Sequence, residues 1–510
     1  MLTKFFQRIS GFGRAVSNFC HRIPVLREFL AWRRRHRKTT IALIFLIAHV
    51  VGALTSVRAV MQTRTPQGTI AWVVSLNTFP YVAVPAYWVF GGSKFEAYVA
   101  ARRNDLAETG QATKDYAKEL ERLNLLTDAD SVRGRLLQSL TGLPATRGND
   151  IELLIDGAAT FKSIFDGLRE AKEYVLAQFY IIRDPGIGQE FKAALTACAA
   201  RGVRVYLLYD DMGSSDLPDR YLRDLEAAGV TVKGFNTLNE NLGRSQLNFR
   251  NHRKTVIVDG RTAWVGGINV GDEYLGKDPE RGEWRDTFVR MRGPVVQSVQ
   301  LTFEEDWHWA AKEVLSLNRI PEAAPGGVSR EMASLPSGPA DPFETCTLFH
   351  LHLINAAQKR LWIASPYFVP DEQFLSALHL AALRGVDVRV MVPETTDSAL
   401  ANLSGWSFVE DLSKSGIRFY RYQKGFMHQK VMLVDDETCT VGTANFDNRS
   451  FRLNFELTIA VFDRSFSGQV AQMLERDLSN SRLVGVQEVK EKGFWWHFGM
   501  RSARIMSPVQ

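Results

Sequence analysis

The sequence predicts an α/β fold built from two copies of one unit, preceded by a hairpin of two membrane-spanning helices. Two apolar stretches near the start predict the hairpin, and an order of strands and helices that occurs twice predicts the duplicated fold. At 510 residues the chain is too long for one ordinary hydrophobic core, which agrees with a division into several parts.

The two apolar stretches, residues 39–57 and 69–90, are close in length to the ~20 residues that a helix needs to cross a bilayer. The first carries no charge unless His49 is protonated, and we expect a neutral His49 that faces the second helix. Ten Lys or Arg residues precede residue 39, whereas the short connection holds only Arg58 and Arg64. The positive-inside rule therefore places both ends of the hairpin in the cytoplasm. A cleaved signal peptide is disfavoured because the first stretch begins too late and is too long.

After the hairpin the composition becomes that of a soluble protein. The net charge of +6 favours an anionic partner, either a membrane or nucleic acid, and four widely spaced cysteines indicate neither a disulfide framework nor a zinc site. The predicted parts are a basic cytoplasmic leader (1–38), the hairpin (39–92), a connector (93–148), a first α/β half (149–325), a second α/β half (326–485) and an aromatic and basic tail (486–510).

An internal repeat divides the soluble part into its two halves. Each half follows the order strand, helix, strand, over residues 173–182, 190–202 and 203–211 in the first and over residues 360–369, 373–385 and 386–394 in the second. Because strands alternate with helices, each half is expected to form α/β units around a largely parallel sheet.

One set of polar residues occurs once in each half at identical spacing. Its pattern is H-x-K-x4-D followed by G and N, and its members are His252, Lys254, Asp259, Gly266 and Asn269 in the first half and His428, Lys430, Asp435, Gly442 and Asn445 in the second. Two matches at equivalent repeat positions are strong evidence of a shared role. The alternative, in which these polar residues merely lie at the edges of two strands, is disfavoured. TVIVD and VMLVD are expected to be buried strands that project both polar sets toward one place.

These motifs resemble those of the phospholipase D superfamily. The segments RNHRKTVIVDGRTAWVGGINVGDEY, WRDTFVRMRGPVV, SPYFVPDE and GTANFDNRSFRLNFE, and the hairpin with TPQGTIAW, resemble its bacterial cardiolipin synthases, and the similarity spans nearly all of residues 39–463. It implies two phospholipase D-like α/β/α halves packed about a pseudo-twofold axis, with one active site at the seam. Gly267 stands where the second motif has Thr443, so any hydroxyl contact to phosphate is expected on one side only.

The resemblance implies a membrane-bound phosphatidyltransferase that forms cardiolipin from two phosphatidylglycerol molecules and releases glycerol, through a phosphatidyl-histidine intermediate. Two histidines are needed because a nucleophile and a proton donor must act on opposite sides of phosphorus. By analogy with the family, His252 attacks, while His428 protonates the leaving group and then activates the incoming hydroxyl. An ordinary pKa of about 6.5 lets histidine hold both forms near neutral pH.

Neither a metal nor a cofactor is expected, because the phosphate oxygens would have cationic and amide ligands of their own, namely Lys254, Lys430, Asn269 and Asn445. Each histidine should also have a carboxylate on its second ring nitrogen. By resemblance, Asp286 serves the first half and Glu456 the second, although Glu283 lies near Asp286 in the sequence. Asp259 and Asp435 are counted with the candidate catalytic residues, but a bracing role is favoured because both directly follow their strands.

Three other functions are weighed against this one. A phospholipase D hydrolase or transphosphatidylase acting on other phospholipids uses the same histidine pair, and so does a membrane-anchored nuclease. Nucleic acid is disfavoured as a partner because the soluble part has no basic stripe interleaved with aromatic residues. A scaffold without catalytic activity is disfavoured because both motifs are complete.

Two further groups of residues receive plainer interpretations. His350, His352 and His379 lie in apolar helical patterns and are expected to be core or surface histidines rather than metal ligands. The tail suits either the membrane interface or packing on the domain, because it combines Trp495, Trp496 and Phe498 with Arg501 and Arg504. The expected location is the inner membrane of a bacterium, with several passes and a cytoplasmic catalytic part, and the expected partners are phosphatidylglycerol and other membrane phospholipids.

Overall fold

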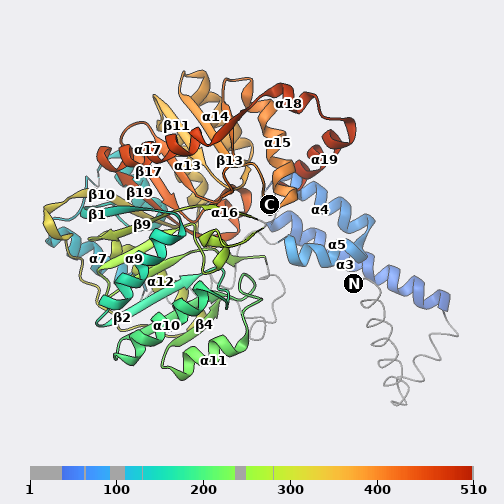
Figure 1. The fold of residues 1–510 in the computed structure, drawn as a ribbon. Coiled ribbons are helices and arrows are strands. Elements are labelled where there is room, and N and C mark those ends of the chain that lie inside the picture. Colours follow the sequence, from blue (N-terminus) through green and yellow to red (C-terminus); the bar gives the residue numbers. More distant parts are fainter. Residues whose placement is uncertain are drawn as a thin grey trace, which may run out of the picture. The chain divides into compact units, whose positions relative to one another are not determined.

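The computed structural model describes residues 37–62, 65–91, 109–128, 130–235, 248–279 and 281–507. The chain divides into two compact units, Met1–Ser93 and Lys94–Gln510 (Figure 1). Almost all of the expected basic leader and the first part of the expected connector lie outside the described residues. The expected boundaries of the two halves stay predictions.

Three helices form the described part of the smaller unit: α3 (Arg37–Gln62), α4 (Pro66–Thr78) and α5 (Pro80–Phe90). Within α3, Lys38–Gln62 is long and apolar enough to cross a membrane, and no other described helix passes the same test. The second expected span is interrupted at Phe79, whose φ of −133° and ψ of 57° are not helical. Pro80 lacks an N–H to continue α4 and disfavours a helical residue before it. The two-helix membrane hairpin is therefore not confirmed.

The three helices share a small apolar core made of Ala59, Leu76, Ala83 and Tyr87. Gly52 permits close packing of α3 on α4, because a Cβ at this position would lie 2.2 Å from the Leu76 carbonyl oxygen. His49 is exposed, and its Nδ1 bonds to the Phe45 carbonyl oxygen at 2.8 Å within α3. The expectation that His49 faces the second helix was therefore wrong.

A continuous sheet of 16 strands runs through the larger unit. The strands of the first half, including the short β8 outside this sheet, are β1 (Thr146–Ile155), β2 (Tyr174–Phe179), β3 (Arg204–Asp210), β4 (Thr231–Phe235), β5 (Arg250–Asn251), β6 (Thr255–Val258), β7 (Thr262–Gly266), β8 (Trp284–Arg285) and β9 (Thr287–Arg292). Those of the second half, including the short β12, β15 and β18 outside the sheet, are β10 (Arg330–Ser337), β11 (Arg360–Ala364), β12 (Phe368–Val369), β13 (Asp387–Pro393), β14 (Arg418–Tyr422), β15 (Phe426–Met427), β16 (Val431–Val434), β17 (Thr438–Gly442), β18 (Phe446–Asp447), β19 (Asn454–Phe462) and β20 (Ser481–Val484).

The strand order shows the duplication directly. It runs β4-β3-β2-β6-β7-β9-β1 and then, in reverse, β10-β19-β17-β16-β11-β13-β14-β20, with β1 and β10 antiparallel at the junction. Along this order, β2, β3 and β4, and likewise β11, β13 and β14, are parallel to one another, while the motif strands β6 and β16 run antiparallel to their neighbours. The expectation of a largely parallel sheet was thus wrong for its centre. Strands joined by a tight turn, such as β6 and β7, must pair antiparallel.

Helices surround the sheet in each half, and most of them pack directly on it. They are α7 (Thr109–Arg122), α8 (Val132–Thr141), α9 (Asp156–Glu170), α10 (Ile187–Ala200), α11 (Asp219–Ala227) and α12 (Val295–Ala311), followed by α13 (Thr345–Ala356), α14 (Glu372–Leu383), α15 (Ala399–Ser413), α16 (Asn448–Arg452), α17 (Arg464–Ser479), α18 (Val486–Lys490) and α19 (Phe494–Ile505). Helices α9, α10 and α11 contribute to one core in the first half, and α13, α14 and α15 to an equivalent core in the second.

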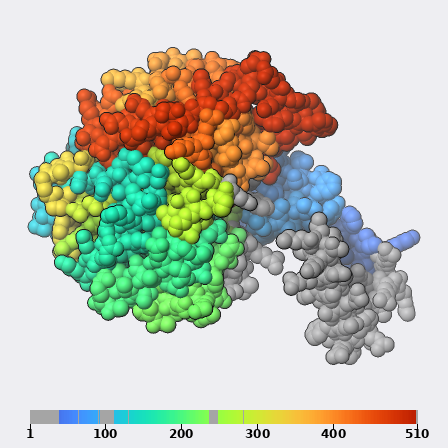
Figure 2. Space-filling model, viewed as in Figure 1, coloured from blue at the N-terminus to red at the C-terminus, as the bar shows by residue number. Residues whose placement is uncertain are grey.

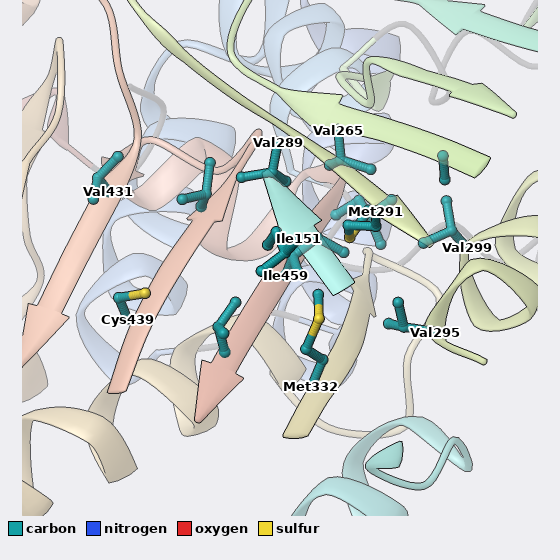
Figure 3. Packing of buried hydrophobic residues seen from close by; sticks show 14 of the residues in the cluster. Ile151, Val265, Val289, Met291, Val295, Val299, Met332, Val431, Cys439 and Ile459 are labelled. Atoms are coloured by element: carbon teal, nitrogen blue, oxygen red, sulfur yellow. The ribbon is translucent and has the colours of Figure 1, made fainter. Parts of the chain in front are cut away.

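A third core joins the halves (Figure 3). Side chains of both halves meet there with residues of α12 and α17, and Figure 3 labels Ile151, Val265, Val289, Met291, Val295, Val299, Met332, Val431, Cys439 and Ile459 among them. All four residues of β6 and all four of β16 are buried, which explains their continuous apolar sequences. The strands that follow the two histidines are therefore anchored on both faces of the sheet.

Candidate active site

The two motif histidines follow short strands that pair with the other half of the fold. β5 pairs with the start of β19, and the His252 N–H donates to the Phe455 carbonyl oxygen at 2.9 Å. β15 pairs with β8, and the His428 N–H donates to the Arg285 carbonyl oxygen at 2.7 Å. In extended backbone, residues two apart point to the same side, so each motif lysine is directed as its histidine is. Both motifs thus meet at the seam between the halves.

Each histidine is hydrogen-bonded to a carboxylate of the other half. His252 Nδ1 lies 3.0 Å from both carboxylate oxygens of Glu456, and His428 Nδ1 lies 2.8 Å from Oδ2 of Asp286. The pairing within each half that we expected was therefore wrong. The reason is that the strand that pairs with each histidine segment belongs to the other half and leads into the carboxylate of that half. With Nδ1–H donated to a carboxylate, Nε2 of each ring carries the reactive lone pair.

The two carboxylates have different neighbours, which accounts for the difference between Gly267 and Thr443. The Thr443 hydroxyl donates to Glu456 Oε2 at 2.5 Å, so in this structure it serves the carboxylate. A Cβ at position 267 would lie 2.2 Å from Asp286 Oδ1, so the shorter aspartate fits only beside a glycine. Asp286 also accepts the Thr287 N–H at 2.8 Å.

Burial controls the charge of the site. Glu456 and Asp286 are fully buried, and although burial alone opposes their ionisation, the nearby lysines and histidines hold the pKa of each carboxyl below its ordinary value. Burial lowers the pKa of His252 to about 4 against the opposing charge of Glu456. Burial, assisted by Lys430, lowers the pKa of His428 to about 4 as well. Both imidazoles are therefore neutral at neutral pH, whereas one neutral and one protonated ring were expected.

The motif lysines are buried at the same place. The ammonium group of each donates to the carbonyl oxygen of its own histidine at 2.5 Å, and Lys430 Nζ also lies 3.0 Å from Nε2 of His428. Burial lowers the pKa of Lys254 well below its ordinary value, and it lowers the pKa of Lys430 to about 8 against the opposing charges of Asp286 and Glu456. Lys430 is therefore mostly charged at neutral pH and loses its charge in mild alkali.

The two motif asparagines are not equivalent. Asn269 accepts the Ile181 N–H at 3.0 Å and donates from Nδ2 to the Tyr274 hydroxyl at 2.9 Å, so both ends of its amide have protein partners. The Oδ1 atom of Asn445 is buried without a hydrogen-bond partner. The expected contacts of both asparagines with phosphate stay predictions.

Asp259 and Asp435 do not lie with the histidines. Each follows its motif strand, at the end opposite to the histidine, with φ of 53°. The Asp259 carboxylate accepts the backbone N–H groups of residues 172, 173 and 174, and that of Asp435 accepts those of residues 358, 359 and 360. Counting these two residues with the catalytic set was therefore wrong, since they brace the starts of β2 and β11.

Aromatic side chains that our sequence analysis missed surround the histidines. The ring of Tyr180 lies 5.0 Å from that of His252, and the ring of Trp284 lies 5.2 Å from that of His428. Tyr180 and Tyr367 occupy the same position of the internal repeat, and this identity was a signal in the sequence. Trp284 directly precedes Arg285, which forms a buried pair with Asp477 at 2.8 Å and so anchors β8 on the second half.

No group of three or more His, Cys, Asp or Glu side chains in the part of the chain that the structure describes could hold a metal ion. His350 Nδ1 donates to the Cys346 carbonyl oxygen at 2.8 Å, and His379 Nδ1 lies 2.9 Å from the Ser415 hydroxyl. Both histidines thus have ordinary protein partners.

Comparisons with known proteins agree with this geometry. A family described as "Cardiolipin synthase, PLD-like domain" matches residues 164–307 and 350–478. "Cardiolipin synthase A" of Pseudomonas fluorescens (strain SBW25) is 45% identical over 465 residues, which are 90% of this chain and 96% of the relative. The protein of the same name from Pseudomonas entomophila (strain L48) is 44% identical over 467 residues, which are 91% of this chain and 97% of the relative.

The fold also resembles that of a solved enzyme. The crystal structure of phosphatidylserine synthase from Haemophilus influenzae Rd KW20 superposes with a TM-score of 0.56 at 16% identity and covers 74% of this chain and 99% of its own. At this identity the likeness extends to the fold alone.

The bracing role of Asp435 predicts a stability effect. Asp435→Ala should lower the free energy of unfolding by about 2 kcal/mol, because backbone N–H groups at the start of β11 lose a charged acceptor and alanine disfavours a positive φ. Urea denaturation of the detergent-solubilised protein measures the effect. The matched control is Asp436→Ala, which removes only the ion pairs with Lys359 and Arg360. Equal stability of the two variants would contradict the bracing role.

Proposed function

Because this chain belongs to the bacterial cardiolipin synthases of the phospholipase D superfamily, we propose that it forms cardiolipin from two phosphatidylglycerol molecules and releases glycerol. The observation that carries this proposal is the pair of imidazoles at the seam, each oriented through Nδ1 by a buried carboxylate. Two such rings can supply a nucleophile and a proton donor for displacement at one phosphorus.

In the first step, Nε2 of His252 attacks phosphorus, and the bond from phosphorus to the glycerol oxygen breaks. The leaving oxygen takes a proton from Nε2 of His428. The anionic diester raises the pKa of His428 when it binds, since a nearby negative charge favours the protonated ring. Lys254 and Lys430 stabilise the charge that develops on the non-bridging oxygens.

In the second step, the hydroxyl of another phosphatidylglycerol gives its proton to Nε2 of His428, and its oxygen attacks phosphorus. The bond from phosphorus to His252 breaks, which yields cardiolipin and restores both imidazoles. One phosphodiester replaces another, so the reaction needs no nucleotide. Transfer exceeds hydrolysis only if the lipid hydroxyl is held in place and water is excluded.

The smaller unit is proposed to hold the enzyme in the bacterial inner membrane. Helix α3 would cross the bilayer, and α4 and α5 would return together as a broken second crossing, which a bilayer tolerates where neighbouring helices satisfy freed backbone groups. The catalytic part would then face the cytoplasm, close to a high density of phosphatidylglycerol.

The first test is the reaction itself. The purified protein, given phosphatidylglycerol alone in liposomes, should release glycerol and form cardiolipin, with phosphatidic acid as a minor product. His252→Ala and His428→Ala should each lower the rate roughly 10³-fold or more, and the double variant should be little slower, because the two residues act as one unit. His379→Ala is the matched control and should keep its activity.

Dominant phosphatidic acid at high lipid density would favour a hydrolase instead. If product forms only after another phospholipid is added, the proposed pair of donor and acceptor is wrong. Substantial activity of either histidine variant would exclude the two-histidine mechanism.

A second test uses pH. Above pH of about 8, Lys430 loses its proton because burial has lowered its pKa, so the KM for phosphatidylglycerol should rise there. In Lys430→Arg the side chain stays charged, so the KM should remain constant to about pH 10. Lys424→Arg, at an exposed ion pair with Glu283, is the control and should keep the wild-type profile. An unchanged rise in Lys430→Arg would exclude Lys430 as its cause.

A third test concerns topology. Reporters inserted near Thr63 should be periplasmic, whereas reporters placed after Gly91 and after Gln510 should be cytoplasmic. A periplasmic reporter after Gly91 would show that α4 and α5 do not cross together.

A further inference from the structure

An apolar pocket lies in the second half of the larger unit, outside both motifs. Most of its lining is apolar. Residues of α15, β13, β14 and β20 and of the segment around β12 line it, and the apolar members include Phe368, Val392, Trp406, Val409, Phe419 and Val484. None of the residues that line it belongs to either H-x-K motif.

Arg421 of β14 is a buried cation on the wall of this pocket. It is 6% exposed, its guanidinium lies 4.3 Å above the Trp406 ring, and one of its terminal nitrogens donates to Asn402 Oδ1. Its Nε has no hydrogen-bond partner. The nearby Glu394 accepts hydrogen bonds from Nε and one terminal nitrogen of Arg482, each at 2.8 Å, and Arg421 forms no ion pair within the described ranges. Burial lowers the pKa of Arg421 to about 10, so it remains charged at neutral pH.

A buried, unpaired guanidinium is costly unless an anion binds it. A small hydrated anion alone would not match this pocket, because it would leave the apolar side chains of the walls without an apolar partner. A ligand with an anionic group and an apolar chain matches both features of the pocket.

The helix that packs on α15 indicates where such a ligand would come from. Helix α19 contacts α15 through Trp496, whose ring lies 5.9 Å from that of Trp406, and through Arg504, which lies over Phe408. Its other side chains expose a large apolar surface, made of Phe494, Trp495, Phe498 and Ile505. Figure 2 shows α18 and α19, in red, as an outer surface of the molecule. Aromatic and aliphatic side chains beside Arg501 are typical of helices at a membrane interface.

We propose that this pocket binds one phospholipid molecule from the membrane, with its phosphate on Arg421 and one acyl chain among the apolar residues. The site goes beyond the proposed reaction, because it involves neither histidine and no motif residue. The C-terminal tail then has both of the roles considered for it. One face of α19 packs on the domain, and the other contacts the membrane surface.

A bound lipid would also contact the segment that holds the second motif. Pro366 and Phe368 line the pocket, and Ser365 beside them accepts the Phe446 N–H at 2.9 Å. β12 pairs with β18, which directly follows Asn445. Occupancy of the pocket therefore supports the position of Asn445 through these two strands.

The test uses full-length protein in detergent micelles and a phosphatidylglycerol with a photoreactive diazirine on one acyl chain, with labelled peptides mapped by mass spectrometry. Wild-type protein should be labelled within residues 401–409. Gly405→Leu should lower this labelling at least fivefold, because a Cβ at position 405 meets only the Phe368 carbonyl oxygen at 3.6 Å and a longer side chain fills the pocket. Gly405→Ala is the matched control and should keep the labelling, and both substitutions favour helix.

The charge is tested with a diazirine diacylglycerol that lacks phosphate. The phospholipid should label wild-type residues 401–409 at least fivefold more than the diacylglycerol, and Arg421→Gln should abolish this preference. Excess inorganic phosphate should leave the labelling unchanged, and competition by it would overturn the assignment to a lipid. Unchanged labelling in Gly405→Leu, or equal labelling by the two lipids in wild type, would overturn the site. The readout needs no turnover, so failure of the proposed reaction leaves this test intact.

Discussion

Two hydrogen bonds that cross the seam support the rest of the structure, one from Nδ1 of His252 to Glu456 and one from Nδ1 of His428 to Asp286. Both carboxylates are fully buried, and a buried carboxylate is stable only where donors surround it. Each of these histidine donors belongs to the half opposite its acceptor, so neither pair of histidine and carboxylate is complete within one half. The strand pairs that cross the seam, β5 with β19 and β15 with β8, place each histidine beside the carboxylate of the other half.

The same burial determines how the seam can receive a phosphodiester. Two carboxylates and two lysines are buried together at the seam, so the charge of each depends on the others. Burial lowers the pKa of His252 and of His428 to about 4, and these low values keep both rings neutral at neutral pH. An arriving phosphate anion changes that balance and favours protonation of a ring. Substrate binding and activation of the proton donor are therefore coupled through one set of buried charges.

Much of this was predictable from sequence, because repeated motifs and buried strands have strong local signals. The duplicated α/β fold and the family are confirmed by the comparisons, and the structure brings both H-x-K pairs to one seam. The pairing of Asp286 and Glu456 with the histidine of the other half was not predictable. It depends on how β8 and β19 pair across the seam with the strands that precede the histidines. Two further features depend on backbone angles that the spacing of residues does not reveal. One is the turn that directs Asp435 away from the histidines, and the other is the break before Pro80 in the second apolar stretch.

The crossed pairing is tested most directly by trapping the phosphatidyl-enzyme from phosphatidyl-p-nitrophenol, whose leaving group needs no proton. Acid quench and peptide mapping then locate the phosphatidyl group. If Glu456 orients His252, Glu456→Gln should form little intermediate. If Asp286 orients His428, Asp286→Asn should form the intermediate on His252 and accumulate it, because the acceptor hydroxyl is not activated. Accumulation on His252 in Glu456→Gln, with none in Asp286→Asn, would contradict the account and support pairing within each half.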